Sequence, residues 1–289
     1  MLMPGSVPLV GIVVLNYNGK DCLPQCLLSL QNIDYQRFFI VVVDNDSTDG
    51  SYEAAEAKFP DCSFLRLPQN QGFATGMNAG IVYALERGAD WVWVFNNDAR
   101  AEKQSLKELI RVAETVPQAG LLSPWIMNED GGRWFAKARI EWLRMRVCHQ
   151  EPTSKELTQA FYPSECLTGC ALLLRRELIN EVGMFDERFF LYYEDADLSV
   201  RAKEQGFLTL VVPTARVYHS EQSEKNPQKL YFLVLSGLLF FRKHAFGWHR
   251  PYLVIYGTMR RIKNYFDIMR GRDNAPIVRR AYSDFYHGR

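Results

Sequence analysis

The chain has 289 residues, of which 47% are hydrophobic and 23% are charged, and its formal net charge is +1 at pH 7. A chain of this length suits one large domain, or one domain with an appendage, and it can bury a substantial core. Its composition is ordinary for a globular protein. A chain of this size and composition does not need disulfides or a structural metal to hold its fold.

The spacing of the cysteines and the lengths of the apolar stretches exclude further classes of protein. The close pairs among the six cysteines are spaced C-x3-C, and no matching histidine pair follows, so we expect reduced thiols and no zinc site. Residues 1–14 lack the basic region and cleavage pattern of a signal peptide. The longest apolar stretch, residues 230–241, is shorter than the roughly 20 residues of a transmembrane helix. We expect a cytoplasmic protein, either free or peripheral at the inner face of the plasma membrane.

In chain order, β-branched runs alternate with helical spacings of leucine or alanine over the first 120 residues. Strands are predicted at residues 10–15, 38–43, 62–67 and 91–95, and helices at residues 21–31, 51–59, 73–87 and 104–115. This alternation implies βαβ units with right-handed crossovers and an α/β fold with a mostly parallel, Rossmann-like sheet flanked by helices.

The second half of the chain is less regular. Residues 128–165 fit either an insertion that covers a substrate or an ordinary surface loop. Strands are expected again at residues 166–174 and 207–212, with a helix at residues 194–205 between them. The chain after residue 227 is expected to be helical, with a long amphipathic basic tail.

Three acidic clusters follow one another within the first 200 residues. They are Asp44-Asn45-Asp46, Asn96-Asn97-Asp98 and Glu194-Asp195-Ala196-Asp197. The first two come directly after apolar runs, as strand ends do, and the carboxyl ends of parallel strands meet where open α/β sheets bind ligands. Together the clusters could hold a cation, a nucleotide and a reacting hydroxyl, which is the chemistry of nucleotide-sugar transfer.

The first cluster has two interpretations. The Asp44 carboxylate can accept the N3–H of a pyrimidine, and Asn45 or Asp46 beside it can reach a ribose. The alternative is a turn, because the run that ends at Gly50 is rich in turn and N-cap residues, and Asp49 can cap the next helix.

The second cluster offers a metal ligand. Alternate side chains of a strand point the same way, so we expect Asn96 and Asp98 on one face. Asp98 can ligate a hard divalent cation, and Asn96 can ligate it weakly or bind the ribose. The alternative is a capped turn before the next helix.

The third cluster begins a predicted helix. Asp197 and Arg201 have the i, i+4 spacing of a helical ion pair. Glu194 and Asp195 lie at the helix N-terminus, where either can cap it, or where one can act as a general base. His219, seven residues beyond the last predicted strand, is either structural or a ligand for Mn²⁺.

Glycines at positions 72, 76 and 80 recur every four residues, which places them on one helix face. This spacing is not the G-x-G-x-x-G fingerprint of dinucleotide-binding proteins. It fits either close helix packing or a close approach of the backbone to a nucleotide, with Asn70 and Asn78 as polar contacts.

The order and spacing of these motifs resemble the family 2 glycosyltransferases, above all bacterial rhamnosyltransferases and related surface-glycan transferases. The motifs are VVLNYNG, VVVDNDSTDG, NQGFATGMNAG, NND, TGCALLLRR, GMFDERFFLYYEDADLSVR and VYH. The resemblance implies a GT-A fold over residues 7–222, with a nucleotide-binding half at about residues 7–120 and an acceptor-binding half at about residues 121–222. A C-terminal basic helical segment, residues 223–289, follows.

The resemblance also implies roles for individual residues. Asp98 is similar to the last Asp of the D-x-D metal motif, and His219 to the His that completes the metal site in some members. Asp195 is similar to the catalytic base, with Glu194 beside it. Asn96 stands where the family usually has the first Asp of D-x-D, and an amide is the weaker metal ligand. The nucleotide-binding set comprises Asn16, Asn18, Asp44, Asn45, Asn70, Gly72, Phe73, Asn78, Asn96 and Asn97.

The implied reaction is an inverting transfer of a sugar from a nucleoside-diphosphate donor to a hydroxyl of a glycan or lipid-linked acceptor, assisted by Mg²⁺ or Mn²⁺. The resemblance suggests dTDP-L-rhamnose as donor, with UDP-sugars as the alternative. A catalytically silent relative that binds a nucleotide sugar or scaffolds a glycan-assembly complex stays open as a second hypothesis. A nucleotidyltransferase ranks low, because the NYNGKD loop has one glycine and no Arg.

The C-terminal segment is strongly basic. Residues 225–289 carry 13 Lys or Arg and 3 Asp or Glu, a balance of +10, against −9 for residues 1–224. One hypothesis is an interfacial helix pair that docks on an anionic membrane and reaches a lipid-linked acceptor. Another is an ordinary helical cap or an oligomer contact. Nucleic-acid binding is the least favoured, because no recognition motif accompanies the charge.

Overall fold

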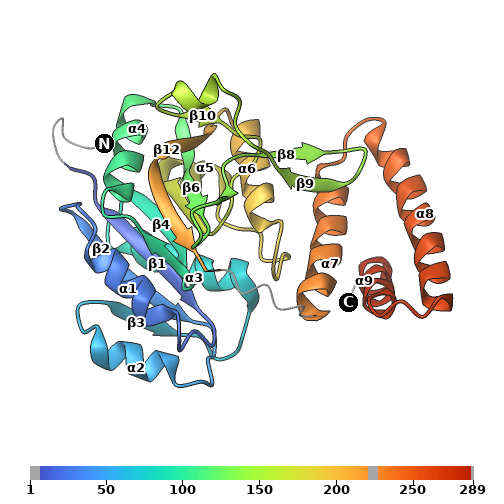
Figure 1. Ribbon diagram of the computed structural model, residues 1–289, viewed down its shortest axis with the longest axis horizontal. Helices are drawn as coiled ribbons and strands as arrows, with labels where there is room; N and C mark the ends of the chain where they lie inside the picture. The colour runs from blue at the N-terminus through green and yellow to red at the C-terminus, as the bar shows by residue number, and fades with distance from the viewer. Residues whose placement is uncertain (1–6, 221–226, 288–289) are drawn as a thin grey trace.

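The computed structural model describes residues 7–220 and 227–287. A large twisted sheet with helices packed on it forms the main body, and three C-terminal helices stand at one side of it (Figure 1). The sequence-based expectation for residues 1–6 and the expected boundary between residues 222 and 223 lie outside the described residues.

The N-terminal half is a parallel βα repeat. Its strands are β1 (Val10–Asn16), β2 (Phe38–Asp44), β3 (Ser63–Arg66) and β4 (Trp91–Asn96), and its helices are α1 (Leu23–Gln31), α2 (Ser51–Lys58), α3 (Gly72–Glu86) and α4 (Ser105–Thr115). β1 pairs in parallel with β2 and β4, and β2 pairs in parallel with β3. The predicted strands and helices of this half are confirmed. β1, β2 and β4 are largely buried, as expected for the inner strands of a parallel sheet, whereas the edge strand β3 is partly exposed.

Beyond β4 the sheet is mixed. The strand order is β10-β12-β6-β11-β4-β1-β2-β3, where β6 is Ala119–Met127, β10 is Tyr162–Pro163, β11 is Ala171–Arg175 and β12 is Leu208–His219. β11 runs antiparallel to β4 and β6, whereas β12 runs parallel to β6. The α/β class with a large central sheet is therefore confirmed, and the parallel arrangement holds from β3 to β4.

Short strands occupy much of the stretch that looked irregular in sequence. They are β7 (Arg133–Phe135), which pairs with β6, and β8 (Ala138–Glu141) and β9 (Arg146–His149), which form a hairpin. A 3-10 turn, η1 (Glu156–Thr158), follows. Between β11 and β12 lie α5 (Arg176–Val182) and α6 (Glu194–Glu204). Strands of three or four residues are too short to show a period in sequence, so they escaped prediction.

The last strand is longer than predicted. We expected it to end at residue 212, with His219 beyond it, but β12 continues to His219 after an irregularity between Val212 and Arg216. Pro213 lies in this irregularity, and a proline normally argues against a continuing strand. His219 therefore lies within a paired strand.

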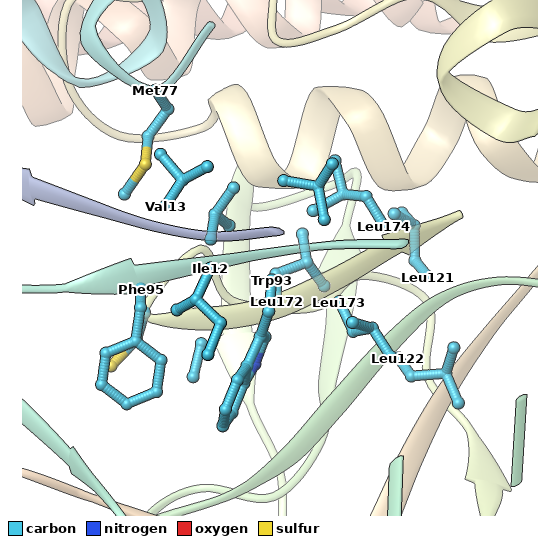
Figure 2. Close-up of a cluster of buried hydrophobic side chains, with 14 of the residues drawn as sticks. Ile12, Val13, Met77, Trp93, Phe95, Leu121, Leu122, Leu172, Leu173 and Leu174 are labelled. Carbon is cyan, nitrogen blue, oxygen red and sulfur yellow. The ribbon is translucent and has the colours of Figure 1, made fainter. Parts of the chain in front are cut away.

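The core lies between the sheet and the helices that cover it. Figure 2 shows side chains of β1, β4, β6, β11 and α3 meeting there, with Trp93 and Phe95 on one face of the sheet. The rings of Trp93 and Phe95 pack edge to face with centroids 4.9 Å apart. On the opposite face, Gly76 and Gly80 let α3 approach β1, since a Cβ at either position would lie within 2.5 Å of a Leu15 or Val13 side chain. Close helix packing thus explains the spacing of these two glycines.

Three helices complete the chain, namely α7 (Pro227–His244), α8 (His249–Met269) and α9 (Ala275–His287). The end of α7 is fixed to α6 through the fully buried carboxylate of Asp197. Lys243 Nζ and His244 Nε2 lie 2.5 Å and 2.7 Å from Asp197 Oδ1, and Arg201 Nε lies 2.8 Å from Oδ2. The predicted Asp197–Arg201 pair is confirmed, and it is part of a larger cluster.

None of the six cysteines is in a disulfide, as expected for reduced thiols. Over the ranges 7–220 and 227–287, no helix combines the length and the apolar character needed to cross a bilayer.

Gly80 tests the contact between α3 and the sheet. A Cβ there would lie 2.2 Å from Val13 Cγ1 and 2.9 Å from Val43 Cγ2. We expect Gly80→Ala to lower the free energy of unfolding by about 1–3 kcal/mol in urea denaturation, because an added methyl group overpacks the core. The control is Gly257→Ala in α8, where the added Cβ would meet only the hydroxyl of Tyr286, at 3.0 Å. Equal stability of the two variants would contradict the packing argument.

Candidate active site

Two strands that are distant in sequence bring Asp98 and His219 together. β4 ends at Asn96, the chain turns through Asn97 and Asp98, and β5 (Ala99–Ala101) then pairs with the end of β12, with Ala99 opposite His219. Asp98 Oδ1 lies 3.1 Å from His219 Nε2. The pairing of β5 with β12 therefore places the carboxylate of Asp98 beside the imidazole of His219, the two side chains predicted as metal ligands.

Glu194 and Asp195 begin α6 after a turn of unusual backbone conformation. Tyr192 and Tyr193 have φ angles of 69° and 68°. This left-handed region costs a residue with a side chain on the order of 1 kcal/mol or more. Such strain persists only where surrounding contacts hold the backbone in place.

α7 supplies these contacts. Ser236 Oγ donates a hydrogen bond to the carbonyl of Leu191 at 2.8 Å. The ring of Tyr193 lies 5.3 Å from the ring of Phe240, between centroids. Gly237 lets the helix come close, because a Cβ there would lie 3.3 Å from the Tyr193 ring. The appended helix thus packs on the turn that presents the two acidic residues.

A single cavity of about 380 Å³ collects these side chains. Its lining includes Asn96, Asp98, Glu194, Asp195 and His219, from β4, the turn after it, α6 and β12. Much of the remaining lining is apolar, and Phe73 of α3 belongs to it. A few convergent polar groups in a largely apolar cavity are typical of a ligand site.

The carboxylate of Asp195 is held by backbone donors. Its Oδ2 accepts a hydrogen bond from the N–H of Gly169 at 2.9 Å, and its Oδ1 accepts one from the N–H of Ala196 at 2.7 Å. Burial raises the pKa of Asp195 above its usual value, and the two backbone hydrogen bonds oppose the rise. A fixed carboxylate of increased basicity suits a general base.

Glu194 has a different environment. It is 5% exposed, and its Oε2 has no hydrogen-bond partner among the residues that the structure describes. Burial raises the pKa of Glu194 well above its usual value, and the charge of the adjacent Asp195 adds to the rise. Glu194 thus differs from Asp195, whose two carboxylate oxygens both accept backbone hydrogen bonds.

The Asp98–His219 pair fits a divalent cation. Asp98 Oδ1 and His219 Nδ1 are buried and lack a hydrogen-bond partner in the described part of the chain, and the approach of Asp98 Oδ1 to His219 Nε2 at 3.1 Å is not a hydrogen bond. A carboxylate oxygen and an imidazole nitrogen are both ligands of Mn²⁺. The described residues contain no group of three or more His, Cys, Asp or Glu side chains that could hold a metal ion. Substrate oxygens or water would have to complete the coordination.

The predicted nucleotide-binding residues at the ends of β1 and β2 form an internal network. Asn16 Nδ2 donates to Asp44 Oδ1 at 2.8 Å and lies 3.1 Å and 2.9 Å from the hydroxyls of Ser47 and Ser51. Asn97 Nδ2 donates to Asn16 Oδ1 at 2.9 Å. Asn16 and Asp44 are fully buried. The network ties together the loops after β1, β2 and β4.

Further residues of the predicted set extend this network. Asn18 Oδ1 accepts the N–H of Thr48 at 2.9 Å. Asn45 Nδ2 donates to Asn70 Oδ1 at 3.0 Å and to the carbonyl of Gly72 at 3.1 Å. These contacts fix the start of α3, from which Phe73 reaches the cavity. Of the predicted nucleotide-binding set, Phe73 and Asn96 line the cavity itself.

Asn78 lies farther along α3 and is 5% exposed. Its amide donates to the carbonyl of Phe185 at 2.9 Å and to Glu187 Oε1 at 3.0 Å, and its Oδ1 accepts the N–H of Phe185 at 3.1 Å. Both amide hydrogens are therefore used within the protein. This geometry favours a role for Asn78 in holding the chain before α6.

Several residues that line the cavity belong to no motif in the sequence. Trp134 of β7 and His149 of β9 line the cavity, and the Trp134 ring lies 4.7 Å from the His219 ring, between centroids. The insertion that contains them therefore covers one side of the site. Lys229 and Leu233 come from α7, and Lys229 is the one Lys or Arg among the cavity-lining residues of the described chain. The high Lys and Arg content of residues 225–289 was the only sequence signal for Lys229.

Comparison with known proteins identifies related sequences. Residues 11–183 match the family model described as glycosyl transferase family 2. An N-acetylglucosaminyl-diphospho-decaprenol L-rhamnosyltransferase of Mycobacterium tuberculosis is 30% identical over 263 residues, which cover 83% of this chain and 86% of the relative. The dTDP-rhamnosyl transferase RfbF of Shigella flexneri is 24% identical over 253 residues, which cover 84% and 81%.

Solved structures with low sequence identity share the fold. The mannosyltransferase PcManGT from Pyrobaculum calidifontis, solved with GDP-Man and Mn²⁺, has a TM-score of 0.63 at 14% identity and covers 98% of this chain and 88% of its own. GalNAc-T7, solved with UDP, GalNAc and Mn²⁺, has a TM-score of 0.64 at 17% identity. That match covers 80% of this chain, which spans 48% of the length of GalNAc-T7.

Ionisation of Glu194 is expected to destabilise the fold. Because its pKa is raised in the folded state, the contribution of Glu194 to stability is greatest below the usual pKa of Glu and is lost as pH rises through the folded-state value. Glu194→Gln cannot ionise, so its melting temperature relative to wild type should increase from acid to neutral pH, measured by circular dichroism. Glu204→Gln, in the same helix but exposed, should give the same offset at every pH. A pH-independent offset for Glu194→Gln would refute the assignment.

Proposed function

The chain belongs to glycosyl transferase family 2 and has the fold of GT-A glycosyltransferases, and from this premise we propose that it is an inverting, metal-dependent rhamnosyltransferase. The proposed reaction moves L-rhamnose from dTDP-L-rhamnose to a hydroxyl of a lipid-linked glycan. The observation that carries the proposal is the convergence of Asp98, His219 and Asp195 on one cavity.

The identities of donor and acceptor rest on the named relatives. One relative is named for dTDP-rhamnose, and the other for rhamnosyl transfer to N-acetylglucosaminyl-diphospho-decaprenol. Both matches extend over more than four fifths of this chain, so they include the cavity and not only the nucleotide-binding half. A UDP-sugar is the alternative donor.

Asp195 is the proposed general base. The hydroxyl oxygen of the acceptor attacks the anomeric carbon from the face opposite the diphosphate, the bond from that carbon to the diphosphate oxygen breaks, and the proton passes to the Asp195 carboxylate. This single displacement inverts the anomeric centre and releases the nucleoside diphosphate. Because an alcohol is a far weaker acid than a carboxyl group, proton transfer is late, and positioning contributes much of the acceleration.

Positive charge on the donor side has two proposed sources. A divalent cation held by Asp98 and His219 would offset the charge that develops on the leaving diphosphate. Lys229, a basic side chain that lines the same cavity, is the second. A catalytically silent role is not favoured, because the proposed base and the proposed metal residues are all present and converge.

The proposed base and metal ligand can be tested together. We expect Asp195→Asn to lower kcat by about 10²–10⁴-fold, because it removes the proton acceptor but keeps the shape of the side chain. Asp98→Ala should lower activity and weaken the dependence on added Mn²⁺. The assay follows transfer of radiolabelled rhamnose from dTDP-L-rhamnose to a polyprenyl-diphosphate-linked N-acetylglucosamine. Asp61→Asn, an exposed carboxylate outside the cavity, is the control. Wild-type turnover by Asp195→Asn would eliminate the proposed base.

Lys229 is expected to bind the diphosphate of the donor. Lys229→Gln should raise the KM for the donor on the order of tenfold, since a charge-assisted hydrogen bond is lost, and Lys229→Arg should restore much of it. Inhibition by dTDP should weaken in Lys229→Gln, whereas inhibition by thymidine should not change. The control is Lys203→Gln, an exposed Lys of α6. An unchanged KM and unchanged inhibition by dTDP would exclude this role.

A further inference from the structure

α8 exposes a long apolar surface. The described residues contain 18 exposed large hydrophobic side chains, and seven of them lie on this one helix. Their exposed fractions range from 53% to 70%, and the residues are Val254, Ile255, Met259, Ile262, Tyr265, Phe266 and Met269. Isolated exposed apolar residues are normal on a protein surface, but a contiguous set of this kind marks an interaction site.

The seven side chains form one stripe. At 100° per residue they fall within an arc of about 140° around the helix axis. Basic residues border the arc, with Arg261 on one side and Lys263 and Arg270 on the other, all exposed. Between positions 249 and 272 the chain carries six Lys or Arg and a single Asp. An apolar stripe with cationic borders is typical of a helix that lies in a membrane interface.

The opposite side of α8 is already occupied. Gly257 and Asn264 are buried there, and Asn264 Nδ2 donates to the carbonyl of Ala275 in α9 at 3.0 Å. Near the N-terminal end of the helix, the hydroxyl of Tyr256 donates to the carbonyl of Arg144 at 3.1 Å. Figure 1 shows α8 at the outer edge of the molecule, with α7 between it and the sheet. The helix is thus held in place with its apolar stripe directed away from the protein.

We propose that this stripe, which we call the α8 face, docks on the surface of an anionic lipid bilayer. The apolar side chains would enter the boundary between headgroups and acyl chains, while the bordering Arg and Lys would contact anionic headgroups. Trp248, the N-cap residue of α8, is 57% exposed and belongs to the residue type that prefers this boundary. Docking itself does not depend on the proposed function. Its purpose does, because docking would bring the cavity to a lipid-linked acceptor.

Two other occupants fit the α8 face less well. A nucleic acid would require the basic residues at the centre of the surface, but apolar side chains occupy the centre. A second copy of the chain would bring the same cationic borders together, which costs free energy through like-charge repulsion. The positive balance of the helix instead complements an anionic surface.

The test is flotation of the purified full-length protein with vesicles, which needs neither donor nor acceptor. We expect the wild type to float with phosphatidylcholine vesicles that contain phosphatidylglycerol, and to float far less with phosphatidylcholine alone or at high salt. The double variant Met259→Glu/Phe266→Glu should lose tenfold or more in partitioning, an order of magnitude set by the apolar surface removed. The matched control, Leu28→Glu/Val82→Glu, places the same charges on exposed apolar positions of α1 and α3 and should bind as the wild type does.

A second variant separates the charge contribution. Arg261→Gln/Arg270→Gln should lower binding to the anionic vesicles by roughly fivefold per residue and leave binding to phosphatidylcholine unchanged. Circular dichroism spectra that match the wild type would show that both α8 variants are folded.

Three results would overturn the proposal. The first is a wild type that does not float at low salt, and the second is equal flotation of the Met259→Glu/Phe266→Glu variant. The third is analytical ultracentrifugation without lipid that finds a wild-type dimer and a monomeric variant, which would assign the α8 face to a second copy. Because wild-type transfer to a short-chain soluble acceptor can be measured independently, failure of docking is distinguishable from failure of the proposed reaction.

Discussion

The antiparallel pairing of β5 with β12 is the interaction on which the rest of the site depends. It joins residues 99–101 to residues 217–219, and the N–H of Ser220 donates to the carbonyl of Asp98 at 3.0 Å. Because β12 is also paired along β6, its end is fixed relative to the whole sheet. One short ladder of backbone hydrogen bonds therefore sets the separation of Asp98 and His219, which are far apart in the sequence.

The second constraint acts on α6, which is held at both of its faces. Asp195 turns toward the cavity and accepts backbone hydrogen bonds, whereas Asp197 turns away and binds Lys243 and His244 of α7. Two acidic residues of one motif thus have separate positions, since Asp195 faces the proposed active site and Asp197 attaches α6 to α7. The C-terminal helices, which lie outside residues 11–183 that match the family model, are consequently part of the framework of the proposed active site.

Much of the parallel half could be predicted, and so could the approach of the polar ends of its strands, because both depend on local patterns. Buried strands such as β1 and β2 are continuous β-branched runs, and their polar ends must meet at one edge of the sheet. The extension of β12 past Pro213 could not be predicted, since it depends on tertiary pairing. Nor does sequence show whether a buried Asn or Asp faces a ligand or another side chain, as the internal bonds of Asn16 and Asp44 illustrate.

The two left-handed tyrosines have a consequence for how the chain can be shortened. Their backbone conformation favours glycine, yet each carries a ring, and Tyr193 packs on Phe240. A fragment that stops before Pro227 would retain every strand of the sheet but would release this turn, so Asp195 would no longer be presented in one fixed orientation. A fragment that keeps the proposed active site intact is for this reason larger than residues 11–183, which match the family model, and it ends no earlier than α7.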